Sequence, residues 1–262
     1  EISECLVGSE MCIRDRDDIK PSSRKYPFIK FTPDREIGND LVKVENVSKS
    51  IEGVKILDNI SFTLRPNEKT ALISRNDLAT TTLMQIIAGS MAPDSGTVTW
   101  GQTTSRTYLP KDINEEYAGS ELPIIDWLRQ FASKEESDNT FLRGFLGKML
   151  FSGSDVERPV NVLSGGEKVR GMLSKMMLSR ANVLLLDDPT NHLDLESITA
   201  LNDSLIDFKG AIVFTSHDHE FIQTIADHIV EVSAKGVVDR GDTTYDEYLA
   251  HEATQGRVQD LY

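Results

Sequence analysis

The sequence predicts an α/β protein with a mostly parallel core sheet. Two uninterrupted apolar runs of strand length, residues 183–186 and 211–214, carry the prediction of the core sheet, because such runs are typical of strands buried on both faces. Asp187 and Asp188 follow the first run directly. Ligands of parallel sheets bind beyond the carboxyl ends of the strands, so we expect this acidic pair to lie at a ligand-binding site. The alternative is a core strand that ends in a solvated acidic turn.

Composition narrows the class of protein. The chain has 262 residues, of which 39% are hydrophobic, enough for one or two domains with a real core. No apolar run approaches the ~18 residues that a membrane span needs. A net charge of −14 argues against sequence-independent binding of this chain alone to a nucleic-acid backbone. Both cysteines, Cys5 and Cys12, lie near the start, so we expect a body without disulfides in a reducing, cytosolic compartment.

The first residues show neither the pattern of a folded element nor that of a targeting segment. We expect residues 1–16 to be non-native or disordered, and the chain to be a fragment that lacks its natural amino-terminal part. Residues 17–38 mix charge and proline and are interpreted as a linker. Its plain interpretation is a solvated strap that packs Phe28 and Phe31 onto the domain.

Periodicity predicts the elements that follow. Alternating runs predict a small antiparallel sheet with a turn at residues 52–53, and the Phe141 to Met149 stripe predicts the buried face of a helix. The chain closes with a hairpin and a short helix. The other expected elements are strands over 41–47, 54–64, 69–74, 96–100 and 106–109, and helices over 80–88, 124–131 and 140–151.

A helix opens at Ser164, because the apolar residues after it fall on one helical face. Ser164 and Glu167 have the spacing of a capping box, which is the plain interpretation of this segment. Gly165 and Gly166 leave backbone N–H groups at the helix start free to take an anion. The two interpretations are compatible, since the cap presents those groups.

Three motifs then resemble a known family: residues 163–168 (LSGGEK), 186–194 (LDDPTNHLD) and 216–218 (SHD). In this order and spacing they resemble the motifs of the ATP-binding cassette (ABC) ATPases. The PTNHLD sequence resembles the ABC-F branch, which consists of soluble tandem ATPases that act on the ribosome. The resemblance implies an ABC cassette of the P-loop NTPase class over 39–250, with a small antiparallel β subdomain and a helical subdomain beside the mostly parallel core sheet. The end of an interdomain linker over 17–38 would precede it, and a tail over 251–262 would follow it.

The resemblance implies ATP and Mg²⁺ as cofactors. Asp188 and His217 match the catalytic residues: Asp188 would orient or deprotonate the attacking water, and His217 would steady the γ-phosphate. Thr81 and, through water, Asp187 would hold Mg²⁺. A lone histidine after a strand is otherwise more often structural.

The resemblance also implies partners. Ser164, Gly165, Gly166 and Glu167 match the signature that grips ATP held by the opposite cassette, and Asp194 matches the family's interface aspartate. The partner is therefore another cassette, either a missing amino-terminal half or a second copy. The ABC-F resemblance adds the ribosome and tRNA, contacted through the linker, and implies a cytoplasmic protein with no membrane partner.

The family's phosphate loop, G-x-x-x-x-G-K-[ST], is degenerate here. Ser74 and Ala79 replace the two glycines, Thr80 replaces the lysine, and only Thr81 matches. Losing a lysine at ~4 Å from phosphate removes about 4 kcal/mol of attraction at an effective dielectric of about 20. The nucleotide-binding residues carried over are Ser74, Asn76, Ala79, Thr80, Thr81 and Thr82.

Five further positions bear on the chain's own site. Ile51 stands where the family has an aromatic residue that stacks on adenine, and Lys111 stands where it often has a glutamine. Asp188 replaces the usual glutamate and is one methylene shorter. Asp77 would repel phosphate if it faces the nucleotide, and Arg75 would partly compensate.

These features predict a cassette whose own site binds ATP weakly and hydrolyses it slowly, while its signature completes the composite site of a partner in ribosome-linked translation control. Two alternatives stay open. One is the ATPase subunit of an ABC transporter, and the other is a dimerisation module without hydrolysis.

Overall fold

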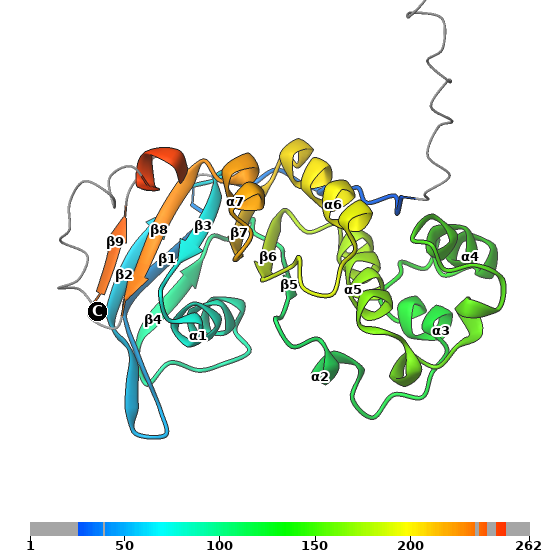
Figure 1. Cartoon of the computed structure of the whole chain (residues 1–262), viewed down its shortest axis with the longest axis horizontal. Helices are drawn as coiled ribbons and strands as arrows, with labels where there is room; N and C mark the ends of the chain where they lie inside the picture. Colours follow the sequence, from blue (N-terminus) through cyan, green and yellow to red (C-terminus); the bar gives the residue numbers. More distant parts are fainter. Residues whose placement is uncertain (1–25, 39, 234–235, 240–244, 250–262) are drawn as a thin grey trace, which may run out of the picture.

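The structure, a computed structural model, describes residues 26–38, 40–233, 236–239 and 245–249, and the predicted segments 1–16 and 251–262 lie outside these residues. Two sheets and a set of helices make up the described chain (Figure 1). The strands are β1 (Val42–Ile51), β2 (Val54–Leu64), β3 (Lys69–Ile73), β4 (Ser95–Trp100), β5 (Arg106–Leu109), β6 (Val183–Asp187), β7 (Ala211–Thr215), β8 (His228–Ser233) and β9 (Gly236–Asp239). The α-helices are α1 (Asp77–Ala88), α2 (Asn114–Tyr117), α3 (Ile124–Arg129), α4 (Asn139–Lys148), α5 (Gly165–Ser179), α6 (Leu195–Asp207) and α7 (His219–Ile225).

The larger sheet confirms the predicted parallel core. Its strand order is β5-β6-β7-β3-β8-β9, and only the β8–β9 pair is antiparallel. Every residue of β6 and of β7 is buried, as the two apolar runs predict. Because β6, β7 and β3 are parallel neighbours, the residues that follow these strands meet at one edge of the sheet.

The smaller sheet is antiparallel, in the order β2-β1-β4. The predicted turn joins β1 to β2 at Glu52 and Gly53, whose φ angles are 52° and 81°. Two positive φ angles suit the tight hairpin turns that match the twist of the flanking strands. Ile51, at the end of β1, is partly buried against the core that this sheet shares with the larger one.

Two expectations, one about the start of a helix and one about the buried face of another, were wrong in detail. Helix α1 begins at Asp77, three residues before the predicted start, because the Asn76 side chain caps it by accepting from the backbone N–H of Leu78. In α4, Leu142 is buried whereas Phe141 keeps 37% of its surface exposed. The buried face of α4 continues from Leu142 through Leu146 to Met149, so Phe141 points away from it.

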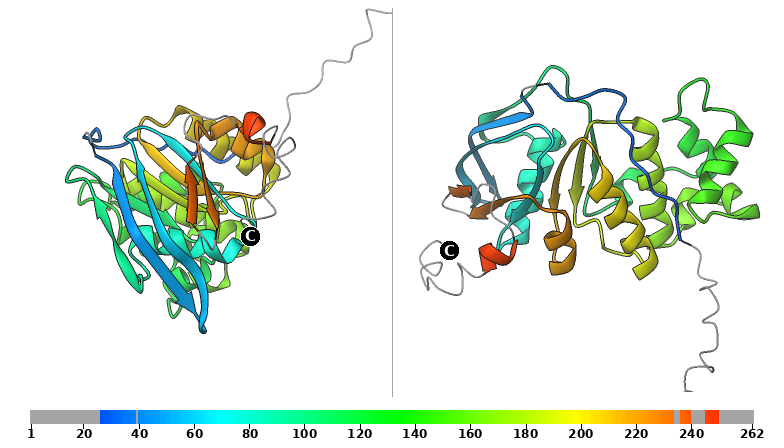
Figure 2. Two further views of the ribbon diagram at one scale, coloured as in Figure 1. Left: turned by 90° about the vertical axis from the view of Figure 1, so that its left-hand side faces the viewer. Right: turned by 90° about the horizontal axis from the view of Figure 1, so that it is seen from above.

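Residues 26–38 cross the molecule from the helical end to the sheets, as Figure 2 shows. The backbone N–H of Phe28 donates to Lys148 O at 2.8 Å, and that of Asp34 donates to Arg180 O at 3.0 Å. Phe31 is buried in the core, as predicted, whereas Phe28 keeps 55% of its surface exposed and stacks under Lys148. Among the described helices, none combines the length and the apolar character that crossing a bilayer requires.

Candidate functional site

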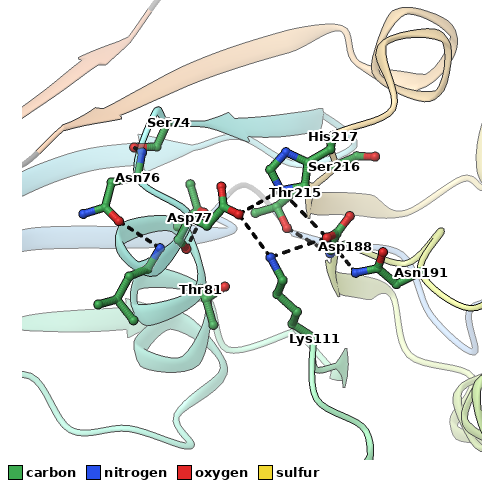
Figure 3. Close-up of polar contacts among 12 residues, drawn as sticks. Ser74, Asn76, Asp77, Thr81, Lys111, Asp188, Asn191, Thr215, Ser216 and His217 are labelled. Atoms are coloured by element: carbon green, nitrogen blue, oxygen red, sulfur yellow. Dashed lines mark hydrogen bonds and ion pairs between the residues drawn. The ribbon is translucent and has the colours of Figure 1, made fainter. Parts of the chain in front are cut away.

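The carboxyl ends of β3, β6 and β7 and the start of α1 converge on one cavity of ≈ 150 Å³ (Figure 3). The larger sheet positions its acidic and histidine side chains, and α1 contributes the degenerate loop. Six of the polar residues that line the cavity are Ser74, Asp77, Thr80, Lys111, Asp187 and His217. The structure therefore brings together the predicted catalytic end of the sheet and the predicted phosphate loop.

Asp187 is the most enclosed acid of the site, with 2% of its surface exposed. Its Oδ1 accepts hydrogen bonds from the Thr215 hydroxyl at 2.7 Å and from the Thr81 hydroxyl at 3.4 Å. Its Oδ2 is buried and makes no hydrogen bond of normal geometry among the described residues, and the buried Tyr108 hydroxyl is the polar group that interacts with this carboxylate. Burial raises the pKa of Asp187, while the two threonine hydroxyls oppose that rise.

An unpartnered buried carboxylate oxygen is expensive, and a hard cation would satisfy it. Thr81 lies within hydrogen-bond reach of the same carboxylate, so a hydroxyl and a carboxylate are already side by side. The predicted magnesium residues thus fit a Mg²⁺ ion in type and arrangement.

Asp188 sits at the turn that ends β6, with a positive φ of 54°. Its backbone N–H donates to the Thr215 hydroxyl at 2.9 Å, and its Oδ2 accepts from the Asn191 side chain at 2.7 Å. Lys111 Nζ lies 3.5 Å from the same Oδ2, and His217 Nε2 lies 3.9 Å from it. Asp188 and His217, the two predicted catalytic residues, therefore face each other.

Lys111 stands between two acids. Its Nζ is 3.4 Å from Asp77 Oδ2, in addition to the contact with Asp188. Burial alone lowers the pKa of Lys111, but the charges of Asp188 and Asp77 outweigh it and raise the pKa. The ammonium group is therefore firmly charged at neutral pH.

The phosphate side of the cavity lacks the glycines and the lysine of an intact phosphate loop. Thr80 is buried, and its hydroxyl donates to the backbone oxygen of Asp77 at 3.0 Å, so its proton is already used within the helix. Ser74 accepts from the backbone N–H of Asn76 at 3.1 Å. Ala79 and Thr82 are buried in α1, away from the cavity lining. Of the six predicted nucleotide-binding residues, Ser74 and Thr80 line the cavity.

The predicted signature residues lie at the start of α5, outside the lining of this cavity. The Ser164 hydroxyl accepts from the backbone N–H of Glu167 at 3.4 Å, and Glu167 Oε2 accepts from that of Ser164 at 2.8 Å, which confirms the predicted capping box. Glu167 also pairs with Arg158 at 2.6 Å. Burial raises the pKa of Glu167, but the bonds from Ser164 and the charge of Arg158 outweigh it and lower the pKa.

His192 packs closely against both signature glycines, and at Gly166 a side chain would force a shift. A Cβ on Gly165 would lie 3.2 Å from His192 Cγ, and a Cβ on Gly166 would lie 2.9 Å from the His192 backbone oxygen. His192 belongs to the turn that starts at Asp188, and the same turn borders a small cavity with Lys111. One turn therefore connects the chain's own site to its signature.

Asp194 caps α6, because its Oδ1 accepts from the backbone N–H of Ser197 at 2.9 Å. Hydrogen bonding from Ser197 lowers the pKa of Asp194. The Asp194 carboxylate thus stabilises the start of α6 within this chain, and its contact with a partner cassette stays a prediction.

Sequence reasoning missed three residues of these sites: Thr215, Asn191 and His192. Thr215 follows the apolar run 211–214 and lies two residues before His217. Aligning the two predicted strands in parallel at their ends would place Thr215 beside Asp187, which is the pairing in the structure. Asn191 and His192 lie in the PTNHLD motif, but only the folded turn shows that one orients Asp188 and the other encloses the signature glycines.

Fold and site together define a class: a nucleotide-binding α/β cassette with an acidic strand end and a serine-capped signature helix. The family model described as "ABC transporter" matches residues 57–191, so the chain belongs to this family of ATP-binding cassette proteins.

Comparison with curated relatives gives the same family. The chain is 59% identical over 246 residues to the ABC transporter ATP-binding protein YkpA of Bacillus subtilis, covering 94% of the chain and 45% of YkpA. It is 36% identical to the ATP-binding protein YbiT of Escherichia coli O157:H7 (89% and 43% covered) and 32% identical to the energy-dependent translational throttle protein EttA of E. coli O6:H1 (82% and 39%). The chain therefore spans less than half the length of these relatives.

Solved structures confirm the fold. An ATP-binding subunit of an ABC transporter superposes with a TM-score of 0.64 at 21% identity, covering 85% of this chain and 98% of that one. The ATP-binding cassette MJ0796, in a dimeric post-hydrolysis state with ADP and Pi, superposes with a TM-score of 0.63 at 17% identity, covering 78% and 100%.

Proposed function

We propose that this chain is the carboxy-terminal cassette of an ABC-F-type ATPase and that its main task is to complete a composite ATP site with a partner cassette. The observation that carries the proposal is the contrast between its two sites. The signature has an intact cap and glycines enclosed by His192, whereas the phosphate loop has lost its lysine and both glycines.

The anion-binding capacity of the signature follows from its geometry. Ser164 satisfies one backbone N–H at the start of α5, and the remaining N–H groups of Gly165 and Gly166 carry the positive end of the helix dipole. A phosphate group held by another cassette is the ligand for which such an end is suited. In the isolated chain the signature lacks the partner's groups that would bind the rest of the nucleotide. A single copy of the chain should therefore hydrolyse almost no ATP.

The ribosome-linked role rests on two observations. The PTNHLD motif resembles the ABC-F branch, and EttA, a relative at 32% identity, is named as a translational throttle protein. On this proposal the chain acts in the cytoplasm, with ATP and Mg²⁺ bound chiefly at the partner's site, and with the ribosome as the larger partner.

The test places this chain in a hybrid, in place of the matching segment of B. subtilis YkpA, and compares two variants of Ser164. Aspartate and asparagine both cap helices well, so Ser164→Asp and Ser164→Asn keep α5 and differ by one negative charge. At ~4 Å from phosphate that charge costs about 4 kcal/mol at an effective dielectric of about 20. We expect Ser164→Asp to lower ATP hydrolysis at least tenfold below Ser164→Asn.

The same hybrid is sedimented with ribosomes in the presence of ATP. Co-sedimentation that Ser164→Asp abolishes and Ser164→Asn keeps supports the proposal. Equal hydrolysis by the two variants would show that the signature does not face a phosphate. Co-purification with a membrane permease instead of ribosomes would assign the chain to the transporter alternative.

A further inference from the structure

Four charged or ionisable side chains of the chain's own site face one another. Asp77 Oδ2 lies 3.1 Å from His217 Nε2 and 3.4 Å from Lys111 Nζ. Asp188 contacts the same two groups from the other side, and Figure 3 shows Lys111 reaching between the two acids. The residue matched to a γ-phosphate contact, His217, therefore already contacts a carboxylate of its own chain.

Asp77 lies where the helix favours an anion. It is the first residue of α1, a helix of 12 residues, and Asn76 caps the helix through the backbone N–H of Leu78. A carboxylate in the first turn interacts favourably with the positive end of the helix dipole. The helix end that binds phosphate in proteins with an intact loop thus carries a built-in negative charge.

The charge around Asp77 disfavours a phosphate chain. Three carboxylates, of Asp77, Asp187 and Asp188, surround the single ammonium group of Lys111. A ligand with several phosphates would bring further negative charge into this set.

We propose that the Asp77 carboxylate takes the place of a phosphate group at the start of α1 and, held by Lys111 and His217, closes this site to phosphate-bearing ligands. The side chain is an internal anion in a position that a glycine-rich loop leaves open for the ligand. The cassette thereby keeps its own site folded without nucleotide. This inference concerns the chain's own site and is independent of the signature's proposed role toward a partner.

The test measures binding of inorganic pyrophosphate to the chain by calorimetry, without any partner cassette. Asp77→Asn removes the charge and keeps the size, and Asp77→Ser is a second variant in case the first does not fold. Asp58→Asn is the matched control, because Asp58 is also paired with a lysine, Lys55, at 2.9 Å and its loss changes the net charge equally.

We expect both Asp77 variants to bind pyrophosphate at least about tenfold more tightly than wild type, since a partly exposed charge close to the ligand is removed. Asp58→Asn should match wild type. Equal affinity of wild type and both folded Asp77 variants would overturn the proposal.

A second arm separates the internal anion from the missing lysine. Thr80→Lys is made with Asp77 present and with Asp77→Asn, and pyrophosphate affinity is compared. If Asp77 closes the site, the new lysine pairs with it, so Thr80→Lys alone gains at least about tenfold less affinity than the double variant. Affinity gains that are the same with and without Asp77 would show that loss of the lysine alone closes the site.

Discussion

His228 shows how one residue can make the stability of the fold depend on pH. It is buried at the start of β8, with Nδ1 3.1 Å from Glu68 Oε2 and Nε2 2.7 Å from Asp239 Oδ1. Burial alone lowers the pKa of His228, but the bonds to Asp239 and Glu68 outweigh it and raise the pKa. Only the protonated ring can donate to both carboxylates.

Because the folded-state pKa of His228 is raised above its ordinary value of about 6.5, its contribution is fully present below that pH and is lost as pH rises through the folded-state pKa. We expect the free energy of unfolding, measured in urea from pH 6 to pH 9, to fall by roughly 1 kcal/mol more in wild type than in His228→Gln. The exposed His219 supplies the control variant His219→Gln, which should keep the wild-type slope. Parallel slopes for wild type and His228→Gln would contradict the assignment.

Asn182 is a residue whose effect belongs to the elements it joins. It is fully buried between α5 and β6, and its Oδ1 accepts from the backbone N–H of Ser105 at 2.7 Å. Its Nδ2 donates to the backbone oxygens of Thr103 and Arg35 at 3.0 Å and 3.3 Å. One amide thus ties β6 to the segment before β5 and to residues 26–38.

Asn182→Ala leaves three backbone groups without their partner. Each unsatisfied buried group costs about 1–3 kcal/mol, and because Arg35 and Thr103 are exposed residues their backbone oxygens can turn to solvent, so we expect a loss of roughly 2–4 kcal/mol in the free energy of unfolding. Urea unfolding at pH 7 measures it, with Asn161→Ala at an exposed position as the control. A loss of less than about 1 kcal/mol would mean that the amide is not needed to join these elements.

At the scale of elements, sequence patterns predicted the structural features that depend on residues close together in the chain. The buried strands β6 and β7 and the cap of α5 were predicted correctly, because hydrophobic runs and capping boxes are local signals. Phe141 was assigned to the core wrongly, because a stripe of apolar residues does not show how wide the covering surface is.

The candidate site was predictable to the same extent. Asp187 ends β6, and Asp188 and His217 lie just beyond the ends of β6 and β7, so their convergence follows from the sheet. The contact of Asp77 with Lys111 spans 34 positions, and the contact of His228 with Glu68 spans 160. No local pattern encodes such pairs; they depend on how α1 and the strand ends are placed in three dimensions.

At the scale of the whole molecule, the larger sheet separates two hydrophobic clusters and belongs to both. Leu184 and Leu186 of β6 point into the cluster that includes the helical end, whereas Val183 and Leu185 point into the cluster shared with the antiparallel sheet. Successive side chains of a strand point to opposite faces, so the same strands form one side of both clusters. Unfolding of either cluster would therefore expose the sheet against which the other cluster packs. We therefore expect the described parts of the chain to unfold together.

The two tryptophans allow this to be measured, because Trp127 lies in the helical end and Trp100 in the antiparallel sheet. Chains that keep one tryptophan each, made with Trp100→Phe or Trp127→Phe, should show coincident urea transitions by fluorescence and circular dichroism. Leu146→Ala, at a fully buried position of α4, should cost about 2–5 kcal/mol and shift the transitions reported by both tryptophans equally. Leu195→Ala, at a side chain that is 70% exposed, is the control and should shift neither. A shift confined to the Trp127 signal would mean that the helical end unfolds on its own, and that the sheet does not couple the two clusters.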